Sequence, residues 1–312
     1  MILLTGSNGF LGSALNAEAV KRDIPVRAAV RSAGKTDIVT AHEVGDIGSN
    51  TAWKTALEGI DTVIHTAARV HVMSDKASDP LAMFRMVNVA GTLNLARQAV
   101  SNGVKRFVFV SSIKVNGELT FPGQIFKPDD TFIPQDPYGL SKYEAEMGLR
   151  ALASETGLEV VIVRPVLVHG PGVKANFAAM LRWLNSGKPL PLGAVVGNQR
   201  SLLGLDNLVD LLYLCATHPA AANQTFLASD GEDVSTADLL HRIGRALGRP
   251  ANLLHVPVGI LKVGAAVLGK ADFAQRLLGN LQVDITKNHQ LLDWTPPVSL
   301  DEGLRRAVVN FK

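Results

Sequence analysis

Cysteine is nearly absent from this chain of 312 residues, since Cys215 is the only one. A single thiol excludes an intrachain disulfide and a CxxC metal site, and we expect no metal. Its place in the apolar run LVDLLYLCATH indicates a buried, inert side chain. Charge is also scarce: 19% of residues are charged, the net charge is +3, and no run of five basic residues occurs. Nucleic acid is therefore not an expected partner.

Long hydrophobic runs are missing as well. The N-terminal MILLTGSNGFLG lacks the basic region and long apolar segment of a signal peptide, so we expect a cytoplasmic protein. The most apolar later stretch, 256–268, contains Pro257 and Lys262 and is too short to span a bilayer. It could dock on a membrane surface, but we expect it to line the core of a second domain, which makes membrane contact an unfavoured alternative.

The first half of the chain alternates apolar strands with amphipathic helices. Strands are predicted at 2–5, 25–30, 62–65, 106–110 and 159–163, with a weaker one at 43–44, and helices at 9–22, 81–100 and 138–156. Such alternation predicts right-handed crossovers and a doubly wound parallel sheet with helices on both faces. The fold class is therefore α/β.

The pattern changes after residue 165. Residues 166–200 are rich in Gly and Pro, and the chain from 230 onward is mostly helical. Segments 201–205 and 225–228, with a helix at 206–217 between them, are predicted to return to the sheet. We therefore expect a dinucleotide-binding domain at 1–165 and a smaller, mostly helical substrate domain from 166–200 and 229–312. Their cleft would lie at the carboxyl edge of the sheet, where open α/β sheets bind ligands.

A glycine loop follows the first predicted strand directly, in the segment TGSNGFLG at 5–12. Gly6 permits a tight turn, Gly9 lets the backbone approach a pyrophosphate, and Gly12 lets the following helix pack closely on the sheet. The diphosphate would then accept hydrogen bonds from the free N–H groups of that helix. The strand before and the helix after this loop predict a Rossmann-type dinucleotide site.

The second strand ends at Arg31, where NAD-binding sites usually offer an acidic residue to the adenosine ribose. An arginine there can pair with a 2′-phosphate, which favours NADP(H). The alternative is that Arg31 stacks on adenine or faces solvent and the protein uses NAD(H). Asp46, beside Ile47, could accept the adenine amino group or be a solvated carboxylate.

Three side chains form a candidate catalytic set. Tyr138 and Lys142 share one face of a helix, and a nearby cation is expected to lower the pKa of a phenol. Tyr138 would then exchange the proton of an alcohol or carbonyl group. Ser112, at the end of the strand 106–110, could bind the same oxygen. Asn88 interrupts an apolar helix and either braces the active-site backbone or makes a structural hydrogen bond.

Together, TGxxGxxG, Asp46-Ile47, HTAA at 65–68, Asn88, Ser112 and YxxxK resemble the extended short-chain dehydrogenase/reductase superfamily. The stretches 67–73, 164–177 and 200–210 are similar to its UDP-glucose-4-epimerase-like branch, which also contains 4-reductases of UDP-4-keto-N-acetylquinovosamine synthesis. The resemblance implies a homodimer built on helices 81–100 and 137–156. It gives Ser112, Tyr138 and Lys142 the catalytic roles. It also implies cofactor contacts at Gly6, Asn8, Gly9, Phe10, Leu11, Gly12, Arg31, Asp46, Ile47, Ala67, Ala68, Asn88, Tyr138, Lys142 and Pro165, and substrate contacts at Ser112, Asn176 and Arg200.

The departures from the family pattern narrow the chemistry. The 4,6-dehydratases carry Asp-Glu after the strand-end hydroxyl, whereas Ile113 and Lys114 follow Ser112 here. Asn116 and His169 each replace a usual tyrosine, and we expect His169 to make a loop hydrogen bond rather than act as a base.

We expect reduction of a UDP-linked 4-keto sugar by NADPH, in the synthesis of surface polysaccharide precursors. The main alternative is a UDP-hexose 4-epimerase with bound NAD. A remote one is a non-catalytic dinucleotide sensor, although such relatives tend to lose the Tyr–Lys pair that this chain keeps.

Overall fold

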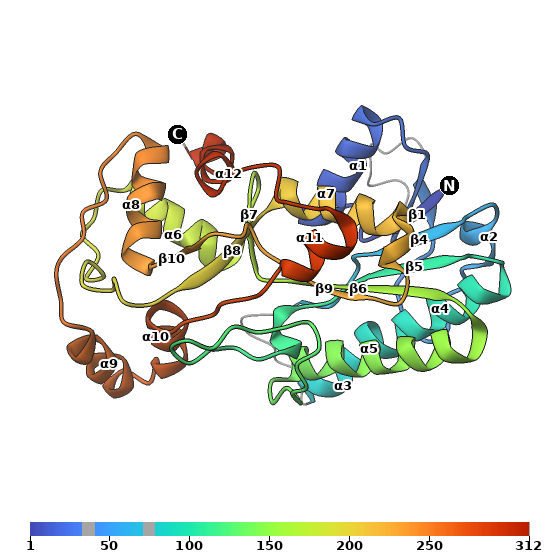
Figure 1. Ribbon diagram of the computed structural model, residues 1–312, viewed down its shortest axis with the longest axis horizontal. Coiled ribbons are helices and arrows are strands. Elements are labelled where there is room, and N and C mark those ends of the chain that lie inside the picture. The colour runs from blue at the N-terminus through green and yellow to red at the C-terminus, as the bar shows by residue number, and fades with distance from the viewer. Residues whose placement is uncertain (33–40, 71–78, 312) are drawn as a thin grey trace.

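The computed structural model describes residues 1–32, 41–70 and 79–311, and a seven-stranded parallel sheet is its largest feature (Figure 1). The strand order is β3-β2-β1-β4-β5-β6-β9. The strands are β1 (Ile2–Thr5), β2 (Val26–Val30), β3 (Ala41–Glu43), β4 (Thr62–His65), β5 (Arg106–Val110), β6 (Glu159–Pro165) and β9 (Thr225–Ala228). The order reverses between β1 and β4, which confirms the predicted α/β, Rossmann-type doubly wound sheet.

Helices cover both faces of this sheet because its strands are apolar on both sides. In β5, Val108 and Val110 pack in one core cluster with residues of α1 (Phe10–Lys21) and α7 (Leu205–Thr217). Phe107 and Phe109 pack in the opposite cluster, with residues of α2 (Lys54–Leu57), α4 (Thr92–Ser101) and α5 (Pro137–Thr156). Figure 1 shows α1, α7 and α11 (Thr286–Leu292) above the sheet and α3 (Pro80–Phe84), α4 and α5 below it.

The helix predicted at 81–100 is present, but it is not α-helical throughout. It consists of α3, a π-helix η2 (Arg85–Gly91) and then α4. A π-helix changes the direction in which its side chains point, and such segments often occur at functional sites. Here it contains Asn88, whose side chain is buried.

A second, smaller sheet forms away from the first, in the order β10-β8-β7 (Figure 1). Its strands are β7 (Leu167–His169), β8 (Arg200–Gly204) and β10 (Asp233–Val234). The prediction that 201–205 returns to the large sheet was wrong, because the place beside β6 is taken by β9. The helices α6 (Ala175–Asn185), α8 (Thr236–Leu247) and α12 (Leu300–Ala307) enclose a separate core. Short 3₁₀ helices lie at Ile113–Val115 (η3), Pro219–Ala221 (η4) and Val309–Phe311 (η5).

The apolar stretch 256–268 does not line that core, contrary to our expectation. It forms α9 (Val258–Val267), which packs against α10 (Ala271–Leu278) and buries none of its own residues. None of the described helices is long and apolar enough to cross a membrane.

Candidate active site

The glycine loop at the carboxyl end of β1 is shaped by close backbone contacts. Gly6 has a φ of +71°, and a Cβ there would lie 2.6 Å from Thr66 Oγ1. A Cβ on Gly12 would lie 2.1 Å from the Gly6 carbonyl oxygen, so only glycine allows α1 to start here. Asn8 and Gly9 are exposed, and Phe10 and Leu11 are partly buried in the first turn of α1.

The N-terminus of α1 fits a dinucleotide diphosphate. Gly9 caps the helix without a side-chain hydrogen bond, and the first turn contains no acidic residue. Neither the cap nor an acidic residue of the first turn supplies a side-chain acceptor to the N–H groups there, and the helix dipole favours an anion at this end.

At the end of β2, Arg31 forms an ion pair that the sequence did not predict. Arg31 Nε lies 2.7 Å from Asp46 Oδ1, and both side chains are more than four-fifths exposed. The carboxylate that the sequence lacks at this point is thus supplied by the loop after β3. Ile47 packs against η2, where a Cβ on Gly91 would come within 2.7 Å of Ile47 Cγ2.

The end of β4 and the π-helix meet beside the glycine loop. Ala67 N donates to Thr5 Oγ1 (3.3 Å), and Ala68 follows it, partly exposed. Asn88 Oδ1 accepts from Arg69 N (2.8 Å), while its Nδ2 donates to Arg69 O (3.0 Å) and to Ser141 Oγ (3.0 Å). Of the two roles predicted for Asn88, the brace is the one its contacts support, because it ties the loop after β4 to α5.

Tyr138 stands in the first turn of α5, which Asp136 caps through Gly139 N (3.1 Å). Its ring meets Phe84 edge-on, with centroids 5.9 Å apart. Burial, assisted by the negative charge of Asp136, raises the pKa of Tyr138 to about 12, and a hydrogen bond with the Ser112 side chain opposes this rise. The structure thus pairs the predicted phenol with the predicted strand-end hydroxyl.

Lys142 lies one turn further along α5 and is almost fully buried. Its Nζ donates to Val110 O (2.8 Å) at the end of β5 and sits 4.4 Å from the centroid of the Phe109 ring. Burial lowers the pKa of Lys142 to about 7, and the Glu146 carboxylate works against that shift. The expectation that Lys142 lowers the pKa of Tyr138 was wrong for this structure, because burial dominates at both groups.

Glu146, one further turn along α5, was not singled out from the sequence. Its carboxylate accepts from Ser111 Oγ (2.6 Å) and Arg164 Nε (2.9 Å), and it is fully buried. Arg164 Nη1 in turn donates to Asn116 Oδ1 (2.9 Å). The signal that could have revealed it is the spacing Tyr138, Lys142, Glu146, which places three ionisable groups on one helix face.

The substituted position Asn116 belongs to this network. Its Nδ2 also donates to Lys127 O (2.7 Å), so both ends of the buried amide are engaged within the chain. Lys114, which stands where the dehydratases carry a carboxylate, pairs with Asp136 (3.0 Å).

The other substituted position, His169, lies fully buried in β7. Its Nε2 is 3.3 Å from Asp230 Oδ2, and its ring stacks on Phe177. These contacts are structural, and they agree with the expectation of a hydrogen bond rather than a catalytic base.

Two arginines, Arg200 and Arg276, lie near each other on β8 and α10. Arg200, the first residue of β8, donates to Gly279 O (3.2 Å). Burial and the charge of nearby Arg276 lower the pKa of Arg200 to about 10. Arg276, on α10, was not predicted. Two guanidinium groups near one another can together bind an anionic group.

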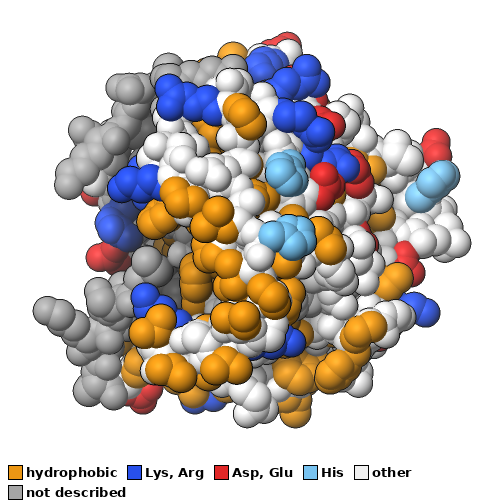
Figure 2. Space-filling view, turned by 90° about the vertical axis from the view of Figure 1, so that its left-hand side faces the viewer, with side chains coloured by type: hydrophobic (Ala, Val, Ile, Leu, Met, Phe, Trp, Pro, Cys, Tyr) orange, Lys and Arg blue, Asp and Glu red, His pale blue; other side chains and the backbone are white. Residues whose placement is uncertain are grey.

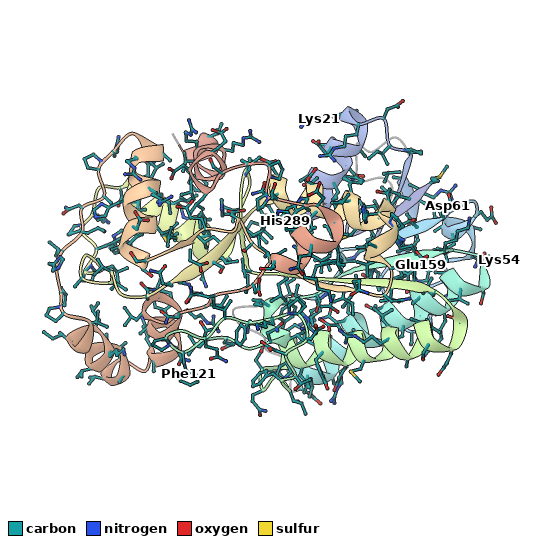
Figure 3. All side chains as sticks on the ribbon, viewed as in Figure 1. Lys21, Lys54, Asp61, Phe121, Glu159 and His289 are labelled. Atoms are coloured by element: carbon teal, nitrogen blue, oxygen red, sulfur yellow. The ribbon has the colours of Figure 1, made fainter. Side chains whose placement is uncertain are left out.

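A hollow of about 1030 Å³ is lined mainly by the segment 114–136, with Gln275 of α10 as a further lining residue. Lys114 and Asp136 belong to this lining, whereas Tyr138, Ser112 and Arg200 do not. Phe121 also lines it, and Figure 3 shows this residue close to α10. Asn176 is exposed at the start of α6, and Pro165 ends β6 opposite Ala228. The described residues contain no group of three or more His, Cys, Asp or Glu that could hold a metal ion.

The fold and this site define a dinucleotide-dependent enzyme of the extended short-chain dehydrogenase/reductase type. The model of the NAD dependent epimerase/dehydratase family matches residues 2–228, and the chain therefore belongs to that family. Its cofactor is a nicotinamide dinucleotide.

Three relatives cover nearly the whole chain. A UDP-glucose 4-epimerase of Vibrio cholerae is 50% identical, over 99% of this chain and 95% of its own. The N-acetyl-alpha-D-glucosaminyl-diphospho-ditrans,octacis-undecaprenol 4-epimerase of Escherichia coli O157:H7 is 27% identical, over 98% and 94%. The crystal structure of a UDP-glucuronic acid 4-epimerase from Bacillus cereus, in complex with NAD, has a TM-score of 0.78 at 20% identity, over 98% and 96%. These relatives favour the epimerase alternative, and 4-keto reduction is not confirmed.

Proposed function

We propose that this enzyme is a 4-epimerase of a UDP-linked hexose that uses bound NAD. The observation that carries the proposal is the Tyr138–Ser112 contact at the sheet's carboxyl edge, with Lys142 one turn away and no carboxylate directly after Ser112. Such a set can move one proton at a sugar hydroxyl but has no acid–base pair for removing water. The three relatives named above support it, since each carries 4-epimerase in its name.

The binding residues fall into two sets, one for the cofactor and one for the substrate. The α1 N-terminus, Arg31 and Asp46 would hold the dinucleotide, and Arg200 with Arg276 would hold the diphosphate of the sugar nucleotide. Bound NAD would supply the hydride acceptor and return the hydride to the sugar. Ser112 would bind the C4 oxygen and orient it toward Tyr138.

Tyr138 has to accept a proton from the 4-hydroxyl group and later return it. With its pKa near 12, the phenol is protonated at neutral pH and is suited to the donating half of that cycle. The accepting half requires a lower pKa, and the ammonium of Lys142, one turn further along α5, would be the cation that stabilises a phenolate. Glu146 supports this by favouring the charged form of Lys142.

The test is turnover of UDP-glucose by the purified enzyme without added cofactor. We expect UDP-galactose to form up to a fixed equilibrium ratio, and denaturation to release NAD. An enzyme that leaves UDP-glucose, UDP-galactose and their N-acetylated forms untouched, yet consumes NADPH with UDP-4-keto-6-deoxy-N-acetylglucosamine, would overturn the proposal.

Reduction of a 4-keto sugar by NADPH is the second candidate, and one observation favours it. The side chain at the end of β2 is Arg31 rather than an acid, and its guanidinium could pair with a 2′-phosphate despite the Asp46 contact. On this candidate, Arg31→Ala weakens NADPH binding about tenfold or more, because a hydrogen bond to a charged group contributes about 1.5–3 kcal/mol, while NADH binding changes little.

The measurement is a fluorescence titration of both cofactors, with Arg305→Ala as the control. Arg305 is also exposed, and its ion pair is with Glu302 on its own helix α12. An NADP(H) preference would be contradicted if Arg31→Ala lowered the affinities for NADPH and NADH equally. It would also be contradicted if the unaltered enzyme used NADH as well as NADPH.

A further inference from the structure

The surface formed by α9 is unusual for a folded protein. A helix that is apolar on all sides is normally buried, yet α9 and its immediate flanks are largely exposed. Ile260, Val263 and Val267 recur at helical spacing on the outer side and are 63%, 66% and 81% exposed. The partly buried residues lie on the opposite side: Val258, Leu261 and Ala265.

The exposed apolar area extends beyond the helix. The large apolar side chains exposed in this region are Leu254, Ile260, Val263, Val267, Leu268 and Phe273. We call these six the α9 patch. Figure 2, which views the molecule from the end that carries α9, shows hydrophobic side chains gathered over the lower part of this face with Lys and Arg near its margins. Exposed apolar side chains gathered on one face are typical of a contact site.

The charge around the α9 patch restricts what could cover it. Residues 239–271 contain no Asp or Glu, between Asp238 and Asp272, and Lys262 lies in α9 while Lys270 caps α10. If two copies paired through α9, Lys262 of each copy would approach the other helix, and α9 has no carboxylate of its own to neutralise it. A partner that is both apolar and anionic could cover the α9 patch and also pair with the lysines. A bilayer containing anionic lipid is such a partner.

The dimensions agree with contact at the surface of a membrane rather than insertion across it. Ten helical residues span roughly 15 Å, about half the thickness of the hydrocarbon core. Because the inner side of α9 packs against α10, only its outer side can reach lipid. The lysine side chains are long enough to extend from the helix to the headgroups.

We propose that the α9 patch, flanked by Lys262 and Lys270, docks this enzyme on an anionic lipid surface. The proposal does not depend on which sugar is the substrate. It places α10, with Arg276, on the side of the molecule nearest the bilayer.

The experiment is co-sedimentation of the full-length protein with vesicles of phosphatidylcholine, with and without phosphatidylglycerol. We expect binding to the anionic vesicles that weakens as salt is raised, and little binding to the neutral ones. Replacing both lysines, Lys262→Gln and Lys270→Gln, should weaken binding to anionic vesicles about thirtyfold, given the usual contribution of a lysine near such a surface.

The double variant Val263→Asp, Val267→Asp should abolish binding to either vesicle. Both positions are exposed, so the fold should persist, which a thermal melt and dinucleotide titration would verify. The matched control is Val20→Asp, because Val20 is 83% exposed on α1, on the other lobe. It should bind vesicles like the unaltered protein.

The following results would overturn the proposal. One is absence of binding to phosphatidylglycerol vesicles, or binding that survives Val263→Asp, Val267→Asp. Another is a change in sedimentation velocity, in that variant alone, from a larger species to a smaller one without vesicle binding. The α9 patch would then be an interface between copies of this chain.

Discussion

Replacing Tyr138 with phenylalanine is expected to lower kcat for 4-epimerisation by about 10²- to 10⁴-fold, the usual contribution of a positioned acid or base. The substitution removes the hydroxyl that contacts Ser112 and leaves the ring against Phe84. KM should change little, because Arg200 and Arg276 would carry most of the binding. Steady-state kinetics with UDP-glucose provide the measurement.

A matched control lies on the same helix. Tyr143 follows Lys142 directly and is partly buried, but its side chain points to a different part of the helix circumference. Tyr143→Phe should retain nearly full activity. If Tyr138→Phe also retained it, with an unchanged melting temperature, the proposed role of Tyr138 as the acid and base of the reaction would be excluded.

The features that the sequence predicts well are those set by local chemistry. The alternation RFVFV in β5 places valines on one face and phenylalanines on the other without reference to distant residues. The glycine loop is equally local, because the Cβ that Gly12 lacks would collide with a carbonyl only six residues away. Both strands and loop are therefore recognisable before the fold is known.

The features that escaped prediction depend on contacts between distant segments. The π-helix at Asn88 is accompanied by hydrogen bonds to Arg69 and Ser141, which no helical periodicity encodes. Strand β8 has an apolar pattern suited to either sheet, and the pairing of β6 with β9 decides between them. Pairing of Arg31 with Asp46 likewise arises only when β2 and β3 lie side by side.

The candidate site likewise combines residues that a local motif predicts with residues that only the fold brings together. Tyr138, Lys142 and Ser112 are found by motif, but Arg276 is brought near Arg200 only by the chain reversal that places α10 beside β8. The environment of a group is even less accessible from sequence than its position. An i, i+4 spacing suggests that Lys142 acidifies Tyr138, whereas the burial of both groups reverses the direction of the pKa shift.

Burial of Lys142 leads to the second large effect, on stability rather than on activity. Its pKa falls from 10.5 to about 7 on folding, so between these values the unfolded chain holds more protons than the folded one. The penalty for burying the ammonium is therefore complete below about pH 7 and fades as pH rises toward 10.5. Within that window the free energy of unfolding should gain up to about 1.4 kcal/mol for each pH unit from this group.

Lys142→Met should remove this gain, because methionine fills a similar volume without a charge. The measurement is urea unfolding at pH 7.5, 8.5 and 9.5, conditions we choose to stay below the titration of Tyr138. Over this range the difference in free energy of unfolding between the two proteins should shrink by about 2 kcal/mol or more. Lys54→Met is the control, since Lys54 is exposed on α2 (Figure 3) and should keep the pH dependence of the unaltered protein. Parallel curves for the unaltered protein and Lys142→Met would mean that the lysine is charged throughout this range. Its contacts with Val110 and Glu146 would then outweigh its desolvation, and Lys142 would hold a full positive charge beside Tyr138 at neutral pH.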